Sequence, residues 1–366
     1  MTPTAAPSRD RSEPAPGSGP LLAIRDLAIS FEGDRGERVT AVDGLSLTIH
    51  DGQTLALVGE SGCGKSVTAL SVLGLLACPP ARIDGGSIRA SGRELLGLGE
   101  ADLLAVRGSE IGMIFQEPVS SLNPVLSIGD QLVEAVRRHR RIPRAAARDH
   151  AVALLKQVGL PRPDAMLAAY PHELSGGMCQ RVMIALALTG GPRLLIADEP
   201  TTALDVTIQA QILDLLLALR QRNRMAILLI THDLGVVAQH ADVVCVMYAG
   251  RVVEYASVRD LFESPAHPYT RGLFSAIPRL GARRPRLRTV DELMTDQTEF
   301  TRLPGHQYGV VPWWPTMRPP PELTVDPADR RASCLHQIAP MHWVACWRTA
   351  YVADHPQRPP DVPAQP

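Results

Sequence analysis

The residues from Gly59 to Ser66 read Gly-Glu-Ser-Gly-Cys-Gly-Lys-Ser and match the phosphate-loop pattern G-x-x-x-x-G-K-[ST] in full. An apolar run at 54–58 precedes them and is typical of a buried parallel strand. The segment 65–76 follows with leucines at helical spacing. A glycine loop between a strand and a helix binds phosphate, because backbone N–H groups and the helix N-terminus point at one anion. The alternative, a chance glycine turn, does not explain the two flanking elements.

In such a loop Lys65 is expected to reach the β- and γ-phosphates, and the Ser66 hydroxyl to ligate Mg²⁺. The glycines let the backbone curl around the phosphate chain. The expected nucleotide-binding residues of this stretch are Gly59, Ser61, Gly62, Cys63, Gly64, Lys65, Ser66 and Val67.

The overall composition favours a cytoplasmic globular protein. The chain has 366 residues, which suits one large domain with appendages. Its net charge of -1 gives no general attraction to nucleic acid or anionic lipid. No apolar run approaches the roughly 18 residues of a membrane span, and no signal-peptide core is present. The six cysteines are widely spaced, which argues against a disulfide scaffold.

The N-terminal part predicts a tail followed by a small sheet. Residues 1–20 are rich in Pro, Ser, Ala and Gly and are expected to be disordered. The runs 27–31 and 45–49 alternate apolar with small or polar residues and predict half-buried antiparallel strands. Phe31 has two interpretations, a core aromatic or a ring stacked on adenine, and the sequence does not decide between them.

The middle of the chain predicts a mainly helical insertion at about 117–190. A strand at 111–115 ends in Gln116 and is followed by a loop rich in turn-forming residues. Helices are expected at 127–141 and 145–158. The basic run 137–141 favours a helix C-terminus; a nucleic-acid patch is the alternative, but the run is short and has no interleaved aromatics.

A second anion-binding helix start is expected at Ser175. The sequence Leu-Ser-Gly-Gly (174–177) places an N-cap serine and the flexible Gly177 before a helical apolar pattern. An ordinary helix start would have the same pattern, but a Ser-Gly-Gly turn also suits a phosphate. This second site, unlike the first, has no lysine.

Two adjacent carboxylates follow the apolar run 194–197. Acids at the end of a buried strand are costly unless a metal, a partner or a reaction uses them. Strand alternation would direct Asp198 and Glu199 to different sides. Asp198 suits the Mg²⁺ shell, and Glu199 suits polarising a water for attack on the γ-phosphate. The alternative is a pair of exposed acids that cap the next segment.

The remaining polar candidates lie at later element ends. Asp205 precedes a helix, and capping that helix or a role between subunits are both open. The strand 226–230 ends near His232, at the sheet edge where a parallel α/β sheet places its ligands. The runs 243–248 and 251–255, joined by Ala-Gly, predict a hairpin that closes the domain.

Together these motifs resemble the ATP-binding-cassette (ABC) transporter ATPases. The phosphate loop or Walker A motif, Gln116, the 174–181 signature, the Walker B motif with its glutamate (194–199), the 203–205 loop and His232 occur in the family order over about 21–265. The stretches 116–124, 199–209 and 267–273 are similar to those of the oligopeptide, dipeptide and nickel importers. The resemblance implies an α/β fold: a P-loop NTPase (RecA-like) core with an antiparallel β subdomain and a helical insertion.

The resemblance also implies a mechanism and partners. Two chains, or one chain and a paralogue, would form a head-to-tail dimer with two ATP and Mg²⁺ at the interface. Each ATP would lie between Lys65 and Ser66 of one subunit and Ser175 and Gly177 of the other. Catalytic roles are implied for Lys65, Gln116, Glu199 and His232, metal contacts for Ser66, Gln116 and Asp198, and nucleotide contacts for Phe31, Gln116 and Asp205. Closure and reopening would drive a membrane permease, which an extracellular solute-binding protein supplies, with this chain at the cytoplasmic face.

The chain departs from the family pattern at two places. Cys179 replaces the Arg or Gln usual in the signature, and little effect is expected. Residues 266–366 resemble the subfamily's C-terminal extension, in which some relatives carry four cysteines for an iron–sulfur cluster. Only Cys334 and Cys346 are present here, and two cysteines cannot supply four thiolates, so no cluster is expected. The proline content predicts that 280–366 is irregular and partly mobile.

One function outside transport, and one other solute within it, are the alternatives. A soluble ABC ATPase acting on nucleic acid would carry long coiled coils or a second cassette, and neither is present, so no nucleic-acid partner is expected. Within the importers, peptide is favoured over nickel or another small solute.

Overall fold

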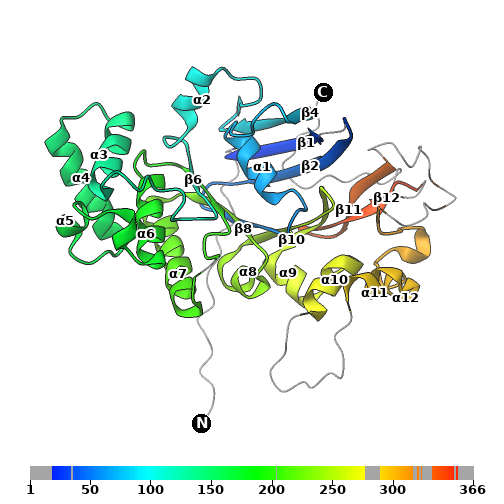
Figure 1. Cartoon of the computed structure of the whole chain (residues 1–366). Helices are drawn as coiled ribbons and strands as arrows, with labels where there is room; N and C mark the ends of the chain where they lie inside the picture. Colours follow the sequence, from blue (N-terminus) through cyan, green and yellow to red (C-terminus); the bar gives the residue numbers. More distant parts are fainter. Residues whose placement is uncertain are drawn as a thin grey trace, which may run out of the picture.

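The computed structural model describes residues 19–33, 36–202, 204–276, 289–315, 320, 323, 332–349 and 352. Two β-sheets lie near the centre, and most helices are grouped around the larger one (Figure 1). Residues 1–18 of the expected tail, Ala203 and much of 280–366 lie outside the described residues. Within the described part, no helix has the length and apolarity needed to cross a bilayer.

The larger sheet carries the phosphate loop. Its strands are β3 (Thr54–Val58), β6 (Ile111–Ile114), β7 (Leu194–Asp198), β8 (Ala226–Thr231), β9 (Val243–Tyr248), β10 (Arg251–Ser257), β11 (Ser333–Ala339) and β12 (His342–Trp347). Their spatial order is β11-β12-β10-β9-β3-β8-β7-β6. The strands from β9 to β6 run parallel, and every residue of β3, β7 and β8 is buried, as their continuous apolar sequences predict.

The smaller sheet is antiparallel and packs beside the phosphate-loop helix. Its strands are β1 (Leu22–Glu32), β2 (Arg38–Ile49), β4 (Ala81–Ala90) and β5 (Arg93–Glu94), in the order β2-β1-β4-β5. The antiparallel strands predicted at 27–31 and 45–49 are confirmed, with Leu27 opposite Leu45. Their expected half-burial is wrong, because most residues on both faces of these runs are buried. Strands β4 and β5 were not predicted. Residues of this sheet and of β3, β8 and β9 form one hydrophobic cluster, which fixes the sheet beside the site.

Helices cover the sheets and form a separate group at one end. They are α1 (Lys65–Val72), α2 (Glu100–Val106), α3 (Ile128–His139), α4 (Arg144–Gln157), α5 (Pro163–Met166), α6 (Gly176–Ala187), α7 (Val206–Asn223), α8 (Leu234–His240), α9 (Val258–Glu263), α10 (Pro268–Ser275), α11 (Val290–Thr295) and α12 (Gln297–Phe300). Figure 1 shows α3 to α6 together on the left, beyond β6. A second hydrophobic cluster joins this group to α7 and to β7 and β8.

Local sequence signals set both ends of α3. The Ser127 hydroxyl accepts a hydrogen bond from the Asp130 N–H and caps α3, which ends with Arg137, Arg138 and His139 in its last turn.

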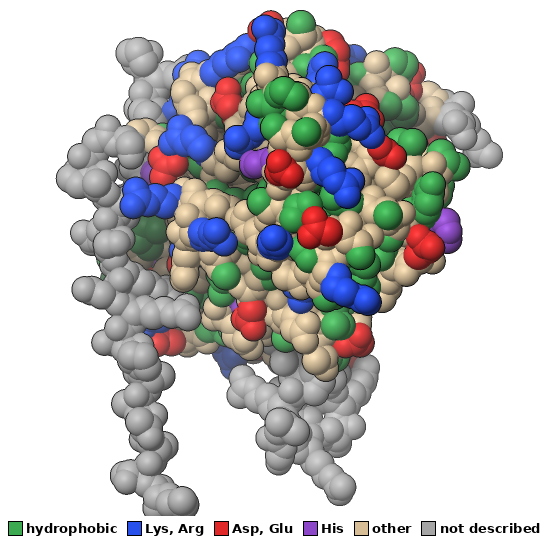
Figure 2. All heavy atoms as spheres, turned by 90° about the vertical axis from the view of Figure 1, so that its left-hand side faces the viewer, with side chains coloured by type: hydrophobic (Ala, Val, Ile, Leu, Met, Phe, Trp, Pro, Cys, Tyr) green, Lys and Arg blue, Asp and Glu red, His purple; other side chains and the backbone are tan. Residues whose placement is uncertain are grey.

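Figure 2 views the molecule from the side of the helical group, the left-hand side of Figure 1. Over the described residues of that face, Lys and Arg side chains are interspersed with acidic and apolar ones and form no continuous basic patch.

The C-terminal region corrects one sequence prediction. Residues 280–366 were expected to be irregular, but β11 and β12 form a hairpin that extends the large sheet through β10. The apolar residues of β12 explain the pairing, since all six residues of this strand are buried. Trp343 is 1% exposed and packs edge-on against Tyr255 of β10, with ring centroids 5.7 Å apart. The proline-rich composition of the region hides this short apolar segment.

Candidate functional site

The phosphate loop curls tightly between β3 and α1. A Cβ at Gly59 would lie 2.2 Å from the Met247 carbonyl oxygen, so only glycine allows this approach to β9. Gly64 caps α1 with φ of 103°, and a Cβ there would lie 2.3 Å from the Ala41 carbonyl oxygen. The loop therefore has the shape that the motif predicts, with Gly59 and Gly64 where the backbone is most crowded.

Lys65 is buried at the base of the loop, 5% exposed. Its ammonium donates to the carbonyl oxygens of Gly59 at 2.8 Å and of Glu60 at 2.7 Å. It also lies 3.7 Å from the Cys63 Sγ. Burial raises the pKa of the Cys63 thiol, while the nearby Lys65 charge lowers it. The ammonium is thus held inside the loop, where a bound phosphate would meet it.

The Ser66 hydroxyl links the loop to the neighbouring strand. It donates to Asp198 Oδ1 at 3.1 Å, and Asp198 is the last residue of β7. Burial raises the pKa of Asp198, the Ser66 hydrogen bond lowers it, and the Glu199 carboxylate raises it again. A hydroxyl and a carboxylate beside a phosphate loop fit Mg²⁺, which prefers oxygen ligands and keeps phosphate oxygens in its shell. This hydrogen bond joins two of the three predicted magnesium ligands, and the third, Gln116, donates to Glu199 instead.

Glu199 lies at the centre of a second cluster. Strand β7 ends at Asp198, and Glu199 follows it with φ of 44°, in the left-handed region. The prediction that strand alternation directs the Asp198 and Glu199 side chains to different sides is therefore wrong, because Glu199 is not part of the strand. Its carboxylate accepts from Gln116 Nε2 at 3.2 Å and from the Thr202 hydroxyl at 2.9 Å. His232 Nδ1 lies 3.4 Å from Glu199 Oε1. Three chain segments thus converge on one carboxylate, which suits a group that activates a water.

The elements explain why these side chains meet. Gln116 follows β6, Glu199 follows β7 and His232 follows β8, and these strands are parallel neighbours. The carboxyl ends of parallel strands share one edge of a sheet, where α/β proteins bind ligands. Sequence reasoning identified all three but missed Thr202, whose place in a tight turn with Glu199 gave no separate signal.

The other residues of the predicted nucleotide set lie in or near the loop. Ser61 is exposed, Gly62 has φ of 83° and Val67 is partly buried in α1. Phe31 is half-buried in β1 and packs against the hydrophobic cluster around the small sheet. That packing fits its core interpretation, and its stacking on adenine stays a prediction.

Ser175 and Gly177 lie at the start of α6, which belongs to the helical group (Figure 1). The Ser175 hydroxyl accepts from the Met178 N–H at 3.4 Å, so the predicted N-cap is confirmed. A Cβ at Gly177 would lie 2.8 Å from the Ile208 side chain of α7. Asp205 caps α7 by accepting from the Ile208 N–H at 3.0 Å. The cap and the Ser-Gly-Gly turn therefore lie next to each other.

Cys179 has a structural place in α6. It is fully buried, and its thiol donates to the Pro171 carbonyl oxygen at 3.5 Å. Gln180, which follows it, donates to the Pro200 carbonyl oxygen at 2.6 Å and ties α6 to the turn after Glu199. Both side chains therefore have partners inside the fold.

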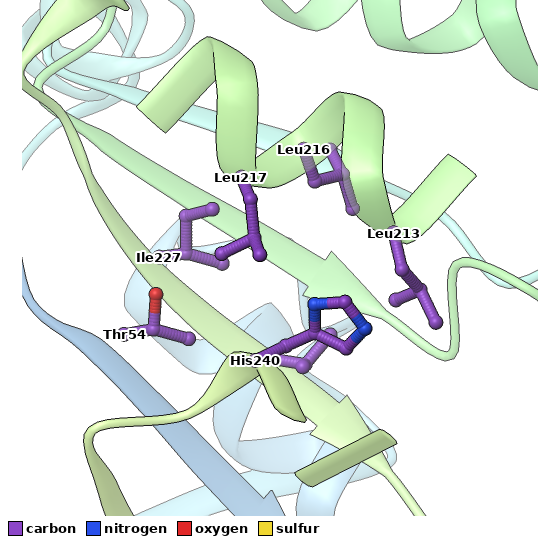
Figure 3. Close-up of a pocket in the computed structure, with 7 residues that line it drawn as sticks. Thr54, Leu213, Leu216, Leu217, Ile227 and His240 are labelled. Atoms are coloured by element: carbon purple, nitrogen blue, oxygen red, sulfur yellow. The ribbon is translucent and has the colours of Figure 1, made fainter. Parts of the chain in front are cut away.

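A small apolar pocket lies elsewhere, between α7, α8 and the strands (Figure 3). It is lined by Thr54, Leu213, Leu216, Leu217, Ile227, Leu229 and His240. Thr54 begins β3 and Ile227 lies near the start of β8, so the pocket is at the amino ends of the parallel strands. The phosphate loop is at their carboxyl ends. This pocket is therefore separate from the predicted nucleotide site.

Comparisons with known families agree with this geometry. A family model for ABC transporters matches residues 42–202, and a model for the C-terminal region of oligopeptide/dipeptide transporters matches residues 253–308. The chain is 46% identical over 354 residues to a probable peptide ABC transporter ATP-binding protein, y4tR, of Sinorhizobium fredii, covering 94% of this chain and 99% of that one. It is 43% identical over 335 residues to the dipeptide transport ATP-binding protein DppD of Bacillus subtilis, covering 92% and 96%.

Solved structures share the fold. A dimeric, post-hydrolysis structure of the ATP-binding cassette MJ0796 with ADP and Pi matches with a TM-score of 0.58 and 25% identity, covering 65% of this chain and 99% of that one. CbiO1 of Clostridium perfringens, part of the ABC transporter complex cbiONQ, matches with a TM-score of 0.57 and 26% identity, covering 67% and 92%. The chain belongs to the ATP-binding subunits of ABC transporters, in the group that carries the oligopeptide/dipeptide-transporter C-terminal region.

Proposed function

We propose that this chain binds and hydrolyses ATP to power a membrane importer for dipeptides or oligopeptides. The observation that carries the proposal is the cluster around Glu199, in which Gln116, Thr202 and His232 surround one carboxylate beside the Ser66–Asp198 pair. The relatives are named as peptide, dipeptide and oligopeptide transport proteins, which supports peptide as the solute. Nickel or another small solute is the alternative, driven by the same site.

The site residues divide the chemistry between them. The loop N–H groups and the Lys65 ammonium bind the phosphate chain and stabilise the charge that develops on it. The Glu199 carboxylate polarises the attacking water, and His232 and Gln116 orient that carboxylate and the water. Ser66, Asp198 and Gln116 would hold Mg²⁺, which neutralises phosphate charge when it is bound. Phe31 would stack on the adenine.

The assembly follows from the second anion site. Ser175 and Gly177 start α6 in the helical group, whereas Lys65 starts α1 after the phosphate loop, and a head-to-tail partner would bring its own Ser175 to the nucleotide. The MJ0796 cassette, solved as a dimer, supports this arrangement. The second ATPase subunit is this chain or a paralogue, and Asp205 would lie at the interface. The complex would also contain transmembrane permease subunits, which an extracellular solute-binding protein supplies. This chain would lie peripherally at the cytoplasmic face of the membrane.

No iron–sulfur cluster is proposed. Cys334 and Cys346 face each other across the β11–β12 hairpin, and both thiols are free. Burial raises the pKa of each thiol, which disfavours the thiolate that a cluster needs. Iron and acid-labile sulfide at stoichiometric levels in anaerobically purified protein would contradict this.

The test is ATP hydrolysis by Glu199→Gln beside wild type. We expect the variant to lose a hundredfold or more in rate, because about that much is typical of a removed general base, while still binding ATP. In ATP and Mg²⁺, size-exclusion chromatography should then show a trapped dimer. Full activity of Glu199→Gln would contradict the assignment. ATPase activity stimulated by RNA or DNA, with no permease association, would favour a nucleic-acid-linked ATPase instead.

A further inference from the structure

The C-terminal extension contacts the phosphate loop through one side chain. Tyr269, the second residue of α10, is fully buried, and its hydroxyl accepts a hydrogen bond from the Glu60 N–H at 3.2 Å. Glu60 is the second residue of the loop, and 209 positions separate the two residues in the chain. The matched C-terminal family region, 253–308, includes Tyr269. A segment outside the predicted nucleotide motifs thus reaches their most constrained part.

The contact falls on the peptide group that also holds Lys65. The N–H of Glu60 and the carbonyl of Gly59 belong to the same peptide unit, which is planar and rigid. The Gly59 carbonyl oxygen accepts from the Lys65 ammonium at 2.8 Å, while the N–H on the other edge donates to Tyr269. This peptide is therefore held from both edges, by the lysine that meets phosphate and by the extension.

Tyr269 is itself fixed by a chain of buried hydrogen bonds. His267 accepts from the Tyr269 N–H with Nδ1 at 3.2 Å, and its Nε2 donates to the Trp313 carbonyl oxygen at 3.0 Å. The Glu254 carboxylate of β10 accepts from the backbone N–H groups of Ala266 and His267 at 2.8 and 2.9 Å. The start of α10 is thereby tied to the large sheet, so the hydroxyl cannot move freely.

An aromatic stack supports the ring from the other side. Tyr248, at the end of β9, lies 4.6 Å from Tyr269 and 4.2 Å from Trp314, measured between ring centroids. Tyr248 and Trp314 are stacked at 15°. Burial raises the pKa of the Tyr269 hydroxyl, so it stays protonated at neutral pH. The hydroxyl is thus a fixed, neutral acceptor at the start of the loop.

We propose that Tyr269 is a positioning residue for the ATPase site: its hydroxyl holds the Gly59–Glu60 peptide, and through it the Lys65 ammonium, in the orientation that receives the phosphates of ATP. The inference goes beyond the proposed transport function, because it assigns the C-terminal extension a direct part in nucleotide binding. Without the hydroxyl, the N–H of Glu60 loses its protein partner at this part-buried position, and the peptide can rotate. ATP would then have to order the loop as it binds, and because this ordering costs binding free energy, the affinity for ATP falls.

The test compares Tyr269→Phe with Trp314→Phe in the full chain. Tyr269→Phe removes only the hydroxyl and keeps the ring, whereas Trp314→Phe weakens the same stack and leaves the hydroxyl in place. Loss of one hydrogen bond predicts that Tyr269→Phe raises the KM and Kd for ATP about three- to tenfold, with kcat changed less. Trp314→Phe should lower Tm without that shift in KM.

A second measurement needs no ATP. Amide hydrogen exchange of the peptides that cover 59–66 should be faster in Tyr269→Phe than in wild type, and unchanged in Trp314→Phe. The exchange measurement tests the Tyr269 contact even if the wild-type chain alone hydrolyses no ATP. Failure of the transport proposal can therefore be distinguished from failure of the positioning role of Tyr269. Wild-type exchange rates in Tyr269→Phe, or equal shifts in both variants, would overturn the proposal.

Discussion

The Ser66 hydroxyl donates a hydrogen bond to Asp198 across 3.1 Å, and this contact joins the phosphate loop to the strand that carries the carboxylates. The two residues are 132 positions apart in the chain. They come together because β3 and β7 both pair with β8, which places their carboxyl ends at one edge of the sheet. A small change in either side chain should therefore alter both the loop and the metal position.

Ser66→Ala should weaken the use of Mg²⁺. The variant loses one oxygen ligand and leaves the buried Asp198 carboxylate without its donor, so the Mg²⁺ concentration for half-maximal ATPase activity should rise about tenfold. Titration of activity with Mg²⁺ at saturating ATP measures this. Ser71→Ala is a matched control in the same helix, since the Ser71 hydroxyl bonds the Thr68 carbonyl oxygen. Equal Mg²⁺ dependence in wild type and Ser66→Ala would contradict the ligand assignment.

His232→Ala should lower kcat with little change in KM for ATP. The His232 ring lies beside the Glu199 carboxylate and is 65% exposed, so its removal takes away an orienting group without opening the core. A loss in kcat of about a hundredfold is typical for a group of this kind. Steady-state kinetics measure both parameters. His172→Ala, an exposed histidine of the helical group, should leave both unchanged.

Mixed dimers should restore activity if the nucleotide sites form between chains. Lys65→Ala removes the phosphate-binding ammonium, and Ser175→Asp keeps a helix-capping side chain but places a negative charge against phosphate. Each variant alone should be inactive. Mixing them creates heterodimers with one intact site, so activity should recover to about a quarter of wild type for random pairing. No recovery, with heterodimers present, would contradict the composite site.

His267 should make stability fall as the pH drops below neutral. Burial lowers the pKa of His267 to about 4, from its ordinary value near 6.5, so the unfolded chain binds a proton that the folded chain refuses. The stability that depends on neutral His267 is fully present above pH 6.5 and is lost as the pH falls from 6.5 towards 4. The loss attributable to His267 between pH 7.5 and 5 should be about 2 kcal/mol.

Urea unfolding at both pH values checks this, with His267→Asn as the comparison. Asparagine can still accept from the Tyr269 N–H, but it does not titrate in this range. The variant should be less stable than wild type at pH 7.5, and the difference between the two free energies of unfolding should shrink by about 2 kcal/mol at pH 5. If the difference in free energy of unfolding between wild type and His267→Asn is the same at both pH values, protonation of His267 does not destabilise the folded protein.

The sequence predicted the parts of the fold whose signal is local. The strand at 54–58 is mostly apolar, the Ser175 cap follows from a short side chain before a helix, and the hairpin at 243–255 follows from two apolar runs around Ala-Gly. For Asp205 the sequence left a helix cap and a role between subunits open, and the structure shows the cap. The cluster of Gln116, Glu199 and His232 was predictable because each follows a parallel strand. The positive φ of Glu199 was not, since it depends on the turn that includes Thr202.

Contacts between distant segments were beyond the sequence. The β11–β12 hairpin pairs with β10 across many residues of proline-rich composition, and neither periodicity nor turn residues indicated it. The hydrogen bond from Glu60 to Tyr269 depends on where α10 is placed by Glu254 and His267. Such contacts are set by tertiary packing, which a local pattern does not encode.

The hydrophobic cluster beneath the phosphate loop contains Ala56 and Val58 of β3 together with Tyr269, Trp313 and Trp314 of the extension. This shared cluster limits which cassettes and extensions can be combined in chimeras of such transporters. A graft that joins one subunit's cassette to another's extension near residue 265 would pair mismatched halves of a single interior. Exchangeable fragments should therefore include both sides of that interior, with strand and aromatic partners kept together.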